Sequence, residues 1–463
     1  MLTQRFARSV LETRDIPAEA LGAARDALLD TLACALAGSL EHTAEIVQRW
    51  LQEAGARPAV SVWGTPLAGS ATDAAFANGI ASHALDFDDS LPTLRGHPSA
   101  TIVPASIAAG ELAGASGKRV LEAIATGVEV AGIVGQALGA GHYMRGWHTT
   151  ATAGTLAATA AAARVLGLTV EQLQQAWGLA ASQAAGLVRN FGTMTKPFHA
   201  GNAARSALTA VTLARAGFTA STEIFEGKNS YFDTYGGAER EPLEKLLAAF
   251  GKPWQIVKPG IYVKRWPCCY CNHRPVAGLL QLMKEHQIKA DEVNVVHIGF
   301  LPGSDEALIC TDPHTGLEGK FSIEYCAAAT LLDGRLTLDT FTDAMVQRPA
   351  IRPLMKKVRR DRVEAKGVYS GVVGYTDVML ETTRGNFQTR INHAPGSPES
   401  PMTANDRAEK FMDCAGRVLG ETGARRLLEL GQRCADLGDI RELARATVPS
   451  SSATRTSSAP ALS

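Results

Sequence analysis

The sequence predicts a mainly α-helical protein with a smaller α+β domain, arranged as a large all-helical domain and an α+β lid. Between residue 16 and about residue 250, apolar and small residues recur at helical spacing in one segment after another. Near residue 255 the composition changes to runs of β-branched residues, which favour strands. A helical pattern returns after residue 398. We therefore predict an all-helical domain at 1–255 that is completed by 399–447, and a lid at 256–398.

The helical domain is predicted from periodicity and from signals at the helix ends. Residues 20–38 have apolar residues at helical spacing and end at Gly38, which we interpret as a C-cap. A capping box opens the segment at Thr169, because Gln172 follows three residues later. Residues 203–218 repeat the small-residue pattern and stop at Gly217. Small residues let helix backbones approach closely, so we expect a dense all-α core.

The lid is predicted from two β-rich segments that flank a helical one. Residues 292–302 read as a strand, and residues 371–392 read as a hairpin whose turn falls at 384–386. Between these segments, residues 322–336 have a helical pattern that ends at Gly334. The last residues, 448–463, are a low-complexity tail that we expect to be disordered.

Composition narrows the classes of function. The 463 residues include 46 basic and 46 acidic side chains, so no global charge favours nucleic acid or an anionic membrane. Eight irregularly spaced cysteines do not form a secreted disulfide framework, and no signal peptide is recognisable, so we expect a cytoplasmic protein. The segment at 149–168 is long enough to span a membrane but is mostly Ala and Thr and contains Arg164, so we expect a buried helix.

The segment "HALDFDDSLPTLRGHPS", residues 83–99, concentrates ionisable groups where the apolar pattern ends. Asp86 and Ser90 follow a helix, and carboxylates are unfavourable at a helix C-terminus because the macrodipole already places negative charge there. A solvated turn would explain them equally well. The functional alternative is a carboxylate that orients a base, with His97 as the base beside it.

Two further basic residues stand at the starts of predicted helices. His148 directly precedes the Ala/Thr helix, where free backbone N–H groups favour anionic ligands. Lys196 precedes Pro197 at the start of another predicted helix. The positive charge of a lysine at a helix N-terminus is opposed by the macrodipole. Surface solvation would explain Lys196, and the alternative is that it binds a substrate carboxylate.

The segment "YVKRWPCCYCNHRP", residues 262–275, has the most unusual composition. Cys268, Cys269, Cys271 and His273 suggest a zinc site, because Cys268 and Cys271 form a C-x-x-C pair, but no second cysteine pair has a finger or ribbon spacing. A cysteine nucleophile is an alternative, although no dedicated base signature accompanies it. Lys264 and Arg265 are the better candidates, as cations facing an acidic substrate. No dinucleotide, Walker or H-E-x-x-H motif is present, so we expect no cofactor and no metal.

Five ordered segments resemble the MmgE/PrpD family over nearly the whole chain. They are "HALDFDDS…GHPSA", "GWHTTATAGTLAA", "TKPFHAGNAARSA", "KRWPCCYCNHRP" and "KFSIEYCAAATLLDGRL". The family includes 2-methylcitrate dehydratase, cis-aconitate decarboxylase and iminodisuccinate epimerase. The resemblance implies a large helical domain and a smaller α+β lid, a homodimer, no required cofactor, and a site between the two domains.

The resemblance also implies the site residues and their roles. His148 or His97 would be the base, Asp86 would orient it, and Tyr325 would be a proton donor or oxyanion partner. Lys196 and Lys264 would bind the substrate carboxylates, and Ser90 would line the site beside them.

Departures from the family pattern bear on the reaction. Ser90 stands where many relatives carry Thr. Thr149 follows His148, where relatives commonly have Pro. The vertebrate decarboxylases have a histidine near the position of Cys269. The motif "DFDDS" also differs from the D-Y-N-D-T of methylcitrate dehydratases. The motifs look nearest to the epimerases, so we predict epimerisation of an imino- or amino-dicarboxylate such as iminodisuccinate. A dehydratase or decarboxylase, and a non-catalytic carboxylate-binding protein, are the alternatives.

Overall fold

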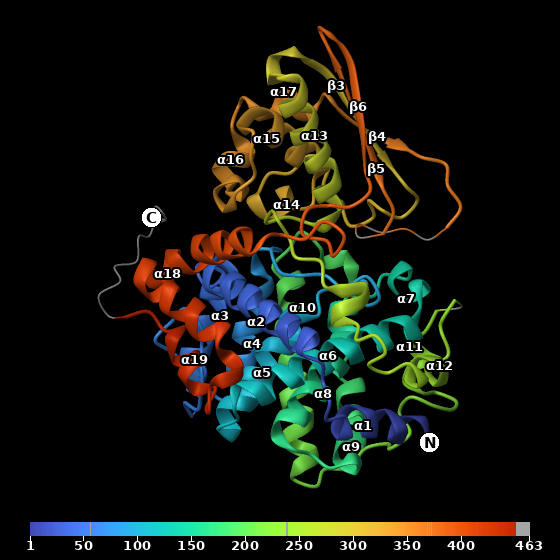
Figure 1. Ribbon diagram of the computed structural model, residues 1–463, viewed down its shortest axis with the longest axis vertical. Coiled ribbons are helices and arrows are strands. Elements are labelled where there is room, and N and C mark those ends of the chain that lie inside the picture. The colour runs from blue at the N-terminus through green and yellow to red at the C-terminus, as the bar shows by residue number, and fades with distance from the viewer. Residues whose placement is uncertain (56, 238, 368, 370, 372, 451–463) are drawn as a thin grey trace.

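The computed structural model describes residues 1–450 apart from residues 56, 238, 368, 370 and 372. Figure 1 shows a large helical part with a smaller α+β part above it. The helical part contains α1 (Leu2–Glu12), α2 (Ala18–Gly38), α3 (His42–Ala54), α4 (Ala71–Ala84), α5 (Ser99–Ala113), α6 (Gly117–Leu138), α7 (Ala140–Met144), α8 (Thr149–Leu166), α9 (Val170–Ala181), α10 (Thr195–Arg215), α11 (Tyr231–Tyr235) and α12 (Leu243–Ala248), with the short hairpin β1 (Val60–Ser61) and β2 (Ala68–Gly69).

The α+β part is a four-stranded sheet with helices on one face. Its elements are α13 (His273–His286), β3 (Val293–Phe300), α14 (Gly316–Gly319), α15 (Ile323–Asp333), α16 (Asp343–Gln347), α17 (Ile351–Met355), β4 (Val358–Arg362), β5 (Thr376–Thr382) and β6 (Gly385–Ile391). The strand order is β4-β3-β5-β6, with β4 parallel to β3 and the other pairs antiparallel. Alternate residues of β5 are buried, as a sheet with one covered face requires.

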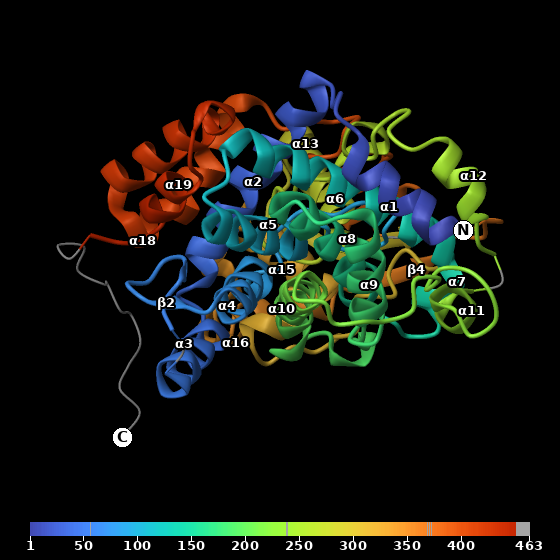
Figure 2. The same ribbon diagram turned by 90° about the horizontal axis from the view of Figure 1, so that it is seen from below.

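The chain then returns to the helical part through α18 (Ala404–Gln432) and α19 (Arg441–Ala446). In Figures 1 and 2 α18 lies beside α2, which is near the other end of the sequence, and α19 contacts α18 and α5. The buried apolar residues form two main clusters. One joins the N-terminal helices to α18 and α19, and the other fills the space between the sheet and the helices of the α+β part.

The central helices of the helical part touch through small residues. A Cβ atom on Gly38 of α2 would lie 2.0 Å from the carbonyl oxygen of Ala81 in α4. A Cβ atom on Gly79 of α4 would lie 2.7 Å from the Cα atom of Gly201 in α10. The backbones therefore meet at distances that no larger side chain allows, in agreement with the dense core predicted from the small residues.

Helix α6 is the one described helix that is long and apolar enough to cross a membrane by length and composition. In the structure 89% of its apolar window is buried among other parts of the protein. The Ala/Thr-rich segment predicted to be a buried helix forms α8, whose residues are almost all buried, with Arg164 binding the carbonyl oxygens of Val10 and Thr13.

Several details differ from the sequence-based predictions. Gly38 is the last residue of α2 and not the C-cap beyond its end. The residue is a glycine because the backbone of α4 leaves no room for a side chain there. The sequence does not predict strand β4, because its residues VRRDR are mostly charged and only Val358 is fully buried. The hairpin turn lies one residue earlier, since Gly385 already pairs with Thr382. The helical pattern predicted after residue 398 forms α18, in which the non-helical residue Gly420 separates two helical stretches. Most of the predicted tail, 451–463, lies outside the described residues.

Candidate active site

The loop between α4 and α5 carries the acidic segment into the interior. Asp86, Asp88 and Asp89 are at most 2% exposed, so the solvated-turn interpretation is wrong. Asp86 has a φ of 51°, in the left-handed region that a residue with a side chain rarely adopts. A two-residue bridge between Ser90 and Tyr262 ties the loop to the segment that leads into the lid.

Three lysine side chains hold three successive carbonyl groups at the start of this loop. The ammonium of Lys320 donates to the carbonyl oxygen of Leu85 at 2.6 Å, that of Lys264 to Asp86 at 2.7 Å, and that of Lys410 to Phe87 at 2.8 Å. Carbonyl groups at the C-terminal end of a helix lack intrahelical donors and carry partial negative charge. The three cations satisfy these carbonyls after α4 and fix the path of the loop.

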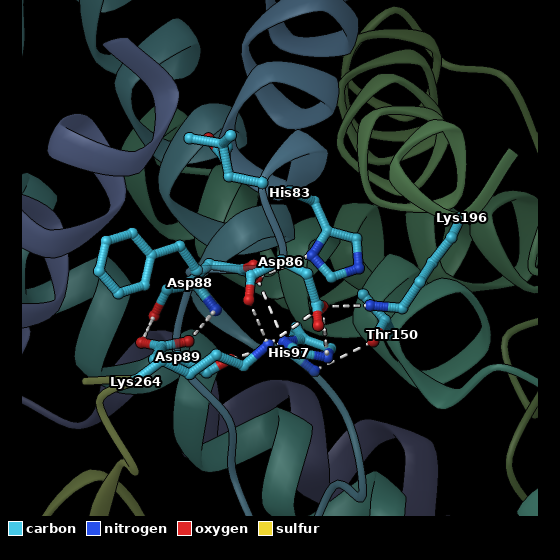
Figure 3. Close-up of polar contacts among 12 residues, drawn as sticks. His83, Asp86, Asp88, Asp89, His97, Thr150, Lys196 and Lys264 are labelled. Atoms are coloured by element: carbon cyan, nitrogen blue, oxygen red, sulfur yellow. Dashed lines mark hydrogen bonds and ion pairs between the residues drawn. The ribbon is translucent and has the colours of Figure 1, made fainter. Parts of the chain in front are cut away.

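The carboxylate of Asp86 is shared by two lysines. Lys196, at the start of α10, forms an ion pair with Oδ1, and Lys264 lies 3.0 Å from the same oxygen (Figure 3). Burial alone would raise the pKa of Asp86, but the two ammonium groups outweigh it and hold that pKa well below its usual range. Burial would likewise lower the pKa of Lys264, but Asp86 and Asp88 raise it. Both groups therefore stay charged near neutral pH.

His97 is oriented as a base. Its Nδ1 donates to the carbonyl oxygen of Asp89 at 2.8 Å and lies 3.3 Å from a carboxylate oxygen of Asp88. In the neutral ring the lone pair is then on Nε2, which is 3.9 Å from Oδ1 of Asp86 (Figure 3). Burial lowers the pKa of His97 more than Asp88 raises it, so the neutral form predominates at pH 7. Asp88 also accepts from His83 at 2.8 Å.

His148 is the N-cap residue of α8, as predicted. Its Nδ1 is 2.9 Å from Nδ1 of His199 in α10, so one of the two nitrogens donates and the other accepts. Burial, with the charge of Lys196 as the next cause, holds the pKa of His148 well below its usual range, and burial lowers the pKa of His199 to about 4. Both rings are therefore neutral at pH 7.

A cavity opens beside these groups, and both parts of the molecule line it. The lining side chains of the helical part include Ser90, Arg95, His97, Tyr143, His148, Phe191 and Lys196, and those of the lid include Cys269, Tyr270, Cys271, Glu306 and Phe321. The structure thus brings four of the seven predicted residues to one cavity, namely Ser90, His97, His148 and Lys196.

Asp86 and Lys264 lie behind this wall and do not line the cavity. Lys264 is fully buried, and its ammonium binds both the carbonyl and the carboxylate of Asp86. The prediction that Lys264 holds a substrate carboxylate is therefore corrected: Lys264 positions Asp86, which in turn holds Lys196.

Tyr325 is not brought to the cavity. It lies in α15, fully buried in the apolar cluster of the lid, and its hydroxyl donates to the carbonyl oxygen of Thr340. A hydroxyl that is already engaged inside another core has no path to a substrate in the cavity. The role of Tyr325 as proton donor or oxyanion partner is therefore corrected to a structural one.

The structure also adds residues that the sequence does not single out. Lys320 and Lys410 reach the loop from positions 235 and 323 residues away in the sequence, and no local pattern marks them. Cys269 belongs to a segment of unusual composition, which does not by itself assign it a role. The zinc interpretation of that segment receives no support, because within the described residues Cys268, Cys271 and His273 do not form a group that could hold an ion.

One other group has the ligand types of a metal site. His83, Asp86, Asp88 and His97 place one ligand atom each within 4.8 Å of one another. Lys196 and Lys264 already balance the charge of Asp86, and both histidines bind Asp88. A divalent cation would have to displace two ammonium groups from a buried carboxylate, so these residues do not fit a resident metal.

The fold and the site together define a class: a two-part, mainly helical protein with buried histidines and a lysine–carboxylate pair beside a cavity between the parts. Family models for the MmgE/PrpD N-terminal and C-terminal domains match residues 4–243 and 266–436. The chain belongs to the MmgE/PrpD family, as its five sequence segments indicated.

Among curated proteins, the chain is similar to human cis-aconitate decarboxylase. The two are 26% identical over 470 residues, which cover 96% of this chain and 93% of the human protein. The cis-aconitate decarboxylase of Aspergillus terreus is 28% identical over 472 residues, which cover 96% of this chain and 95% of the fungal one. Both relatives are named for an enzymatic activity on a tricarboxylate, and this supports an enzyme.

Proposed function

We propose that this protein is a cofactor-independent acid/base enzyme that removes a proton next to a carboxylate of a small di- or tricarboxylate. The observation that carries the proposal is the joint position of His97 and Lys196 on one cavity wall, both held from behind by buried carboxylates. A neutral imidazole can accept the proton, and an adjacent ammonium can stabilise the negative charge that develops on the substrate carboxylate.

The geometry assigns a task to each group. Nε2 of His97 is the free basic nitrogen, because Nδ1 is bound to the carbonyl of Asp89. Lys196 donates one N–H to Asp86 and lies 5.2 and 5.1 Å from the ring centres of Phe191 and Phe321, which limit its access to water. Its remaining N–H groups can bind the substrate carboxylate. Because Lys264 also pairs with Asp86, that carboxylate does not neutralise Lys196 alone, and Lys196 can also pair with an anionic substrate.

Within this reaction class we propose epimerisation of an imino- or amino-dicarboxylate such as iminodisuccinate. The motifs "DFDDS", "RGHPS" and "KRWPCCYCNHRP" support this choice, as does Cys269 at the cavity. An epimerase needs no leaving group and no added electron sink, only a base, an acid and charge stabilisation, which are the groups that line the cavity.

A lyase is the second candidate, and the names of the relatives favour it. Decarboxylation of a cis-aconitate-type acid would use the same carboxylate stabilisation by Lys196, followed by protonation of the resulting carbanion. A non-catalytic carboxylate-binding protein would retain the cation but would not need the neutral histidines beside it.

Proton NMR in D₂O separates these candidates. The purified protein is incubated separately with iminodisuccinate, cis-aconitate and 2-methylcitrate, with the variant His97→Gln as the control for base catalysis. We expect deuterium to enter the α-position of iminodisuccinate with loss of optical activity, and its entry to be at least about 100-fold slower in His97→Gln. Itaconate-type or vinyl signals from the other acids would establish a lyase, and no reaction with any of them would contradict the proposed substrates.

A further inference from the structure

The lid contributes a thiol pair to the cavity wall. Cys269 is 8% exposed and lines the cavity, and Cys271 lines it two residues further on. The segment is held in place, because the backbone N–H of Cys269 donates to the carbonyl oxygen of Lys320 at 3.0 Å and the N–H of Asn272 donates to that of Cys269 at 2.9 Å. The neighbouring Cys268 is fully buried in the apolar cluster of the lid and does not line the cavity.

The two candidate histidines come from the other part of the molecule. His97 and His148 both belong to the helical part, whereas Cys269 belongs to the apolar cluster of the lid. Inversion at a carbon atom requires one group that takes a proton from one face and another that returns a proton to the opposite face. Two groups on the same wall serve this purpose poorly, but one group from each wall can flank a substrate bound between them.

We infer that Cys269 is the second acid/base residue of the cavity, paired with His97 across the reacting carbon of an amino- or imino-dicarboxylate. This assignment rests on the proposed epimerase function and adds a catalytic residue to it. It also gives a chemical reason for the thiol at this position, since a buried structural cysteine would have no need to face a cavity lined by Lys196 and His97.

The proton balance closes without a co-reactant. In one direction the α-C–H bond breaks, Nε2 of His97 takes the proton, the electron pair spreads onto the carboxylate beside Lys196, and the thiol of Cys269 delivers its proton to the opposite face. The enzyme is left with protonated His97 and the thiolate of Cys269. That form has the same number of protons and is the one that the reverse direction requires, where the thiolate abstracts and the imidazolium donates.

The surroundings favour this exchange. A hydrogen bond from Cys271 lowers the pKa of Cys269, burial and the charge of Asp86 oppose this, and Lys264 and Lys196 lower the pKa further, so that the net direction is downward. The pKa of Cys271 is raised, so Cys271 keeps its proton as the donor. The lowered pKa of Cys269 favours the thiolate that the reverse direction requires.

The test separates proton exchange from inversion. The R,R and S,S isomers of iminodisuccinate are each incubated in D₂O with the wild-type protein, Cys269→Ser, Cys269→Ala, and Cys310→Ser as a control in the lid, since Cys310 is half-buried and does not line the cavity. Exchange is followed by NMR and inversion by optical rotation. In Cys269→Ser we expect inversion to fall at least about 100-fold. One isomer should still exchange within about 10-fold of the wild-type rate.

Inversion at the wild-type rate in Cys269→Ser and Cys269→Ala, or loss of exchange for both isomers in a folded variant, would overturn the role of Cys269. Absence of exchange in the wild-type protein would instead overturn the proposed function, and the role of Cys269 with it. Alkylation by iodoacetamide gives a readout independent of turnover. Peptide mass mapping should show Cys269 reacting faster than Cys310 and protected by iminodisuccinate, and unprotected alkylation of Cys269 would contradict its place in the cavity.

Discussion

Asp86 combines a strained backbone with a central electrostatic position. A left-handed φ at a residue with a side chain costs about 1–3 kcal/mol and persists only where surrounding contacts enforce it. Here the conformation presents both the carbonyl and the carboxylate of Asp86 to Lys264, while the carboxylate also reaches Lys196. The strain is thus linked to the function of the residue, which is to hold Lys196 at the cavity.

Tyr325→Phe tests the structural role that replaces the predicted catalytic one. We expect kcat/KM to stay within about threefold of wild type, because the hydroxyl donates to the carbonyl of Thr340 inside the lid. The free energy of unfolding should fall by about 0.5–1.5 kcal/mol through loss of that hydrogen bond, as measured by denaturant titration. If turnover instead fell by about 100-fold or more in a folded variant, Tyr325 would return to the catalytic residues.

At the scale of elements, the site depends on the close approach of α2, α4 and α10. Helix α4 ends where the acidic loop begins, and α10 begins with the turn that carries Lys196. Gly38, Gly79 and Gly201 allow these helices to touch backbone to backbone. A small shift of one helix would therefore separate Lys196 from Asp86.

Gly38→Ala and Gly22→Ala form a matched pair within α2. The new Cβ at Gly38 would meet the backbone oxygen of Ala81 at 2.0 Å, whereas nothing lies within 4 Å of a Cβ at Gly22. We expect Gly38→Ala to lower the free energy of unfolding by about 1–3 kcal/mol, since backbone cannot rotate away. Gly22→Ala should raise it by about 0.5–1 kcal/mol. Equal effects in thermal or denaturant unfolding would contradict the close contact between α2 and α4.

At the scale of the whole molecule, the acidic loop is the point where the parts of the chain meet. Lys320 reaches it from the lid and also donates to the carbonyl oxygen of Pro267 at 3.0 Å. Lys410 reaches it from α18, pairs with Asp30 of α2 at 2.7 Å, and donates to the carbonyl oxygen of Lys264 at 3.1 Å. The lid and the returning C-terminal helix therefore both contribute to the geometry of the site.

Lys320→Met tests this dependence. The change leaves the carbonyls of Leu85 and Pro267 without their donor in a buried position, so the free energy of unfolding should fall by about 1–3 kcal/mol. We also expect kcat/KM to fall about 10- to 100-fold, because the loop that carries Asp86 loses one of its three ammonium contacts. The exposed Lys284→Met in α13 is the control and should change neither quantity. Unchanged turnover in Lys320→Met would show that the lid contact does not position the loop.

Local signals in the sequence are enough to predict most of the helices and the strands β3, β5 and β6. Helical periodicity, the capping box at Thr169 and Gly334 at the end of α15 depend on residues within a few positions of one another, and the structure confirms each of them. The charged strand β4 is not predicted, because it forms through pairing with β3, which lies more than fifty residues earlier in the chain. The sequence also indicates the family and four residues of the cavity, since these lie in motifs that keep their order along the chain.

Which charged side chains face the cavity, and which lie behind it, depends on the packing of the whole chain. Lys264 contacts Asp86 across 178 residues of sequence, and the direction of Tyr325 is set by the lid core around it. The lysines that satisfy the carbonyls after α4 come from three places that are distant in the sequence. The partner of a buried charge is set by which groups the tertiary structure brings within contact distance, and local spacing along the sequence does not determine those groups.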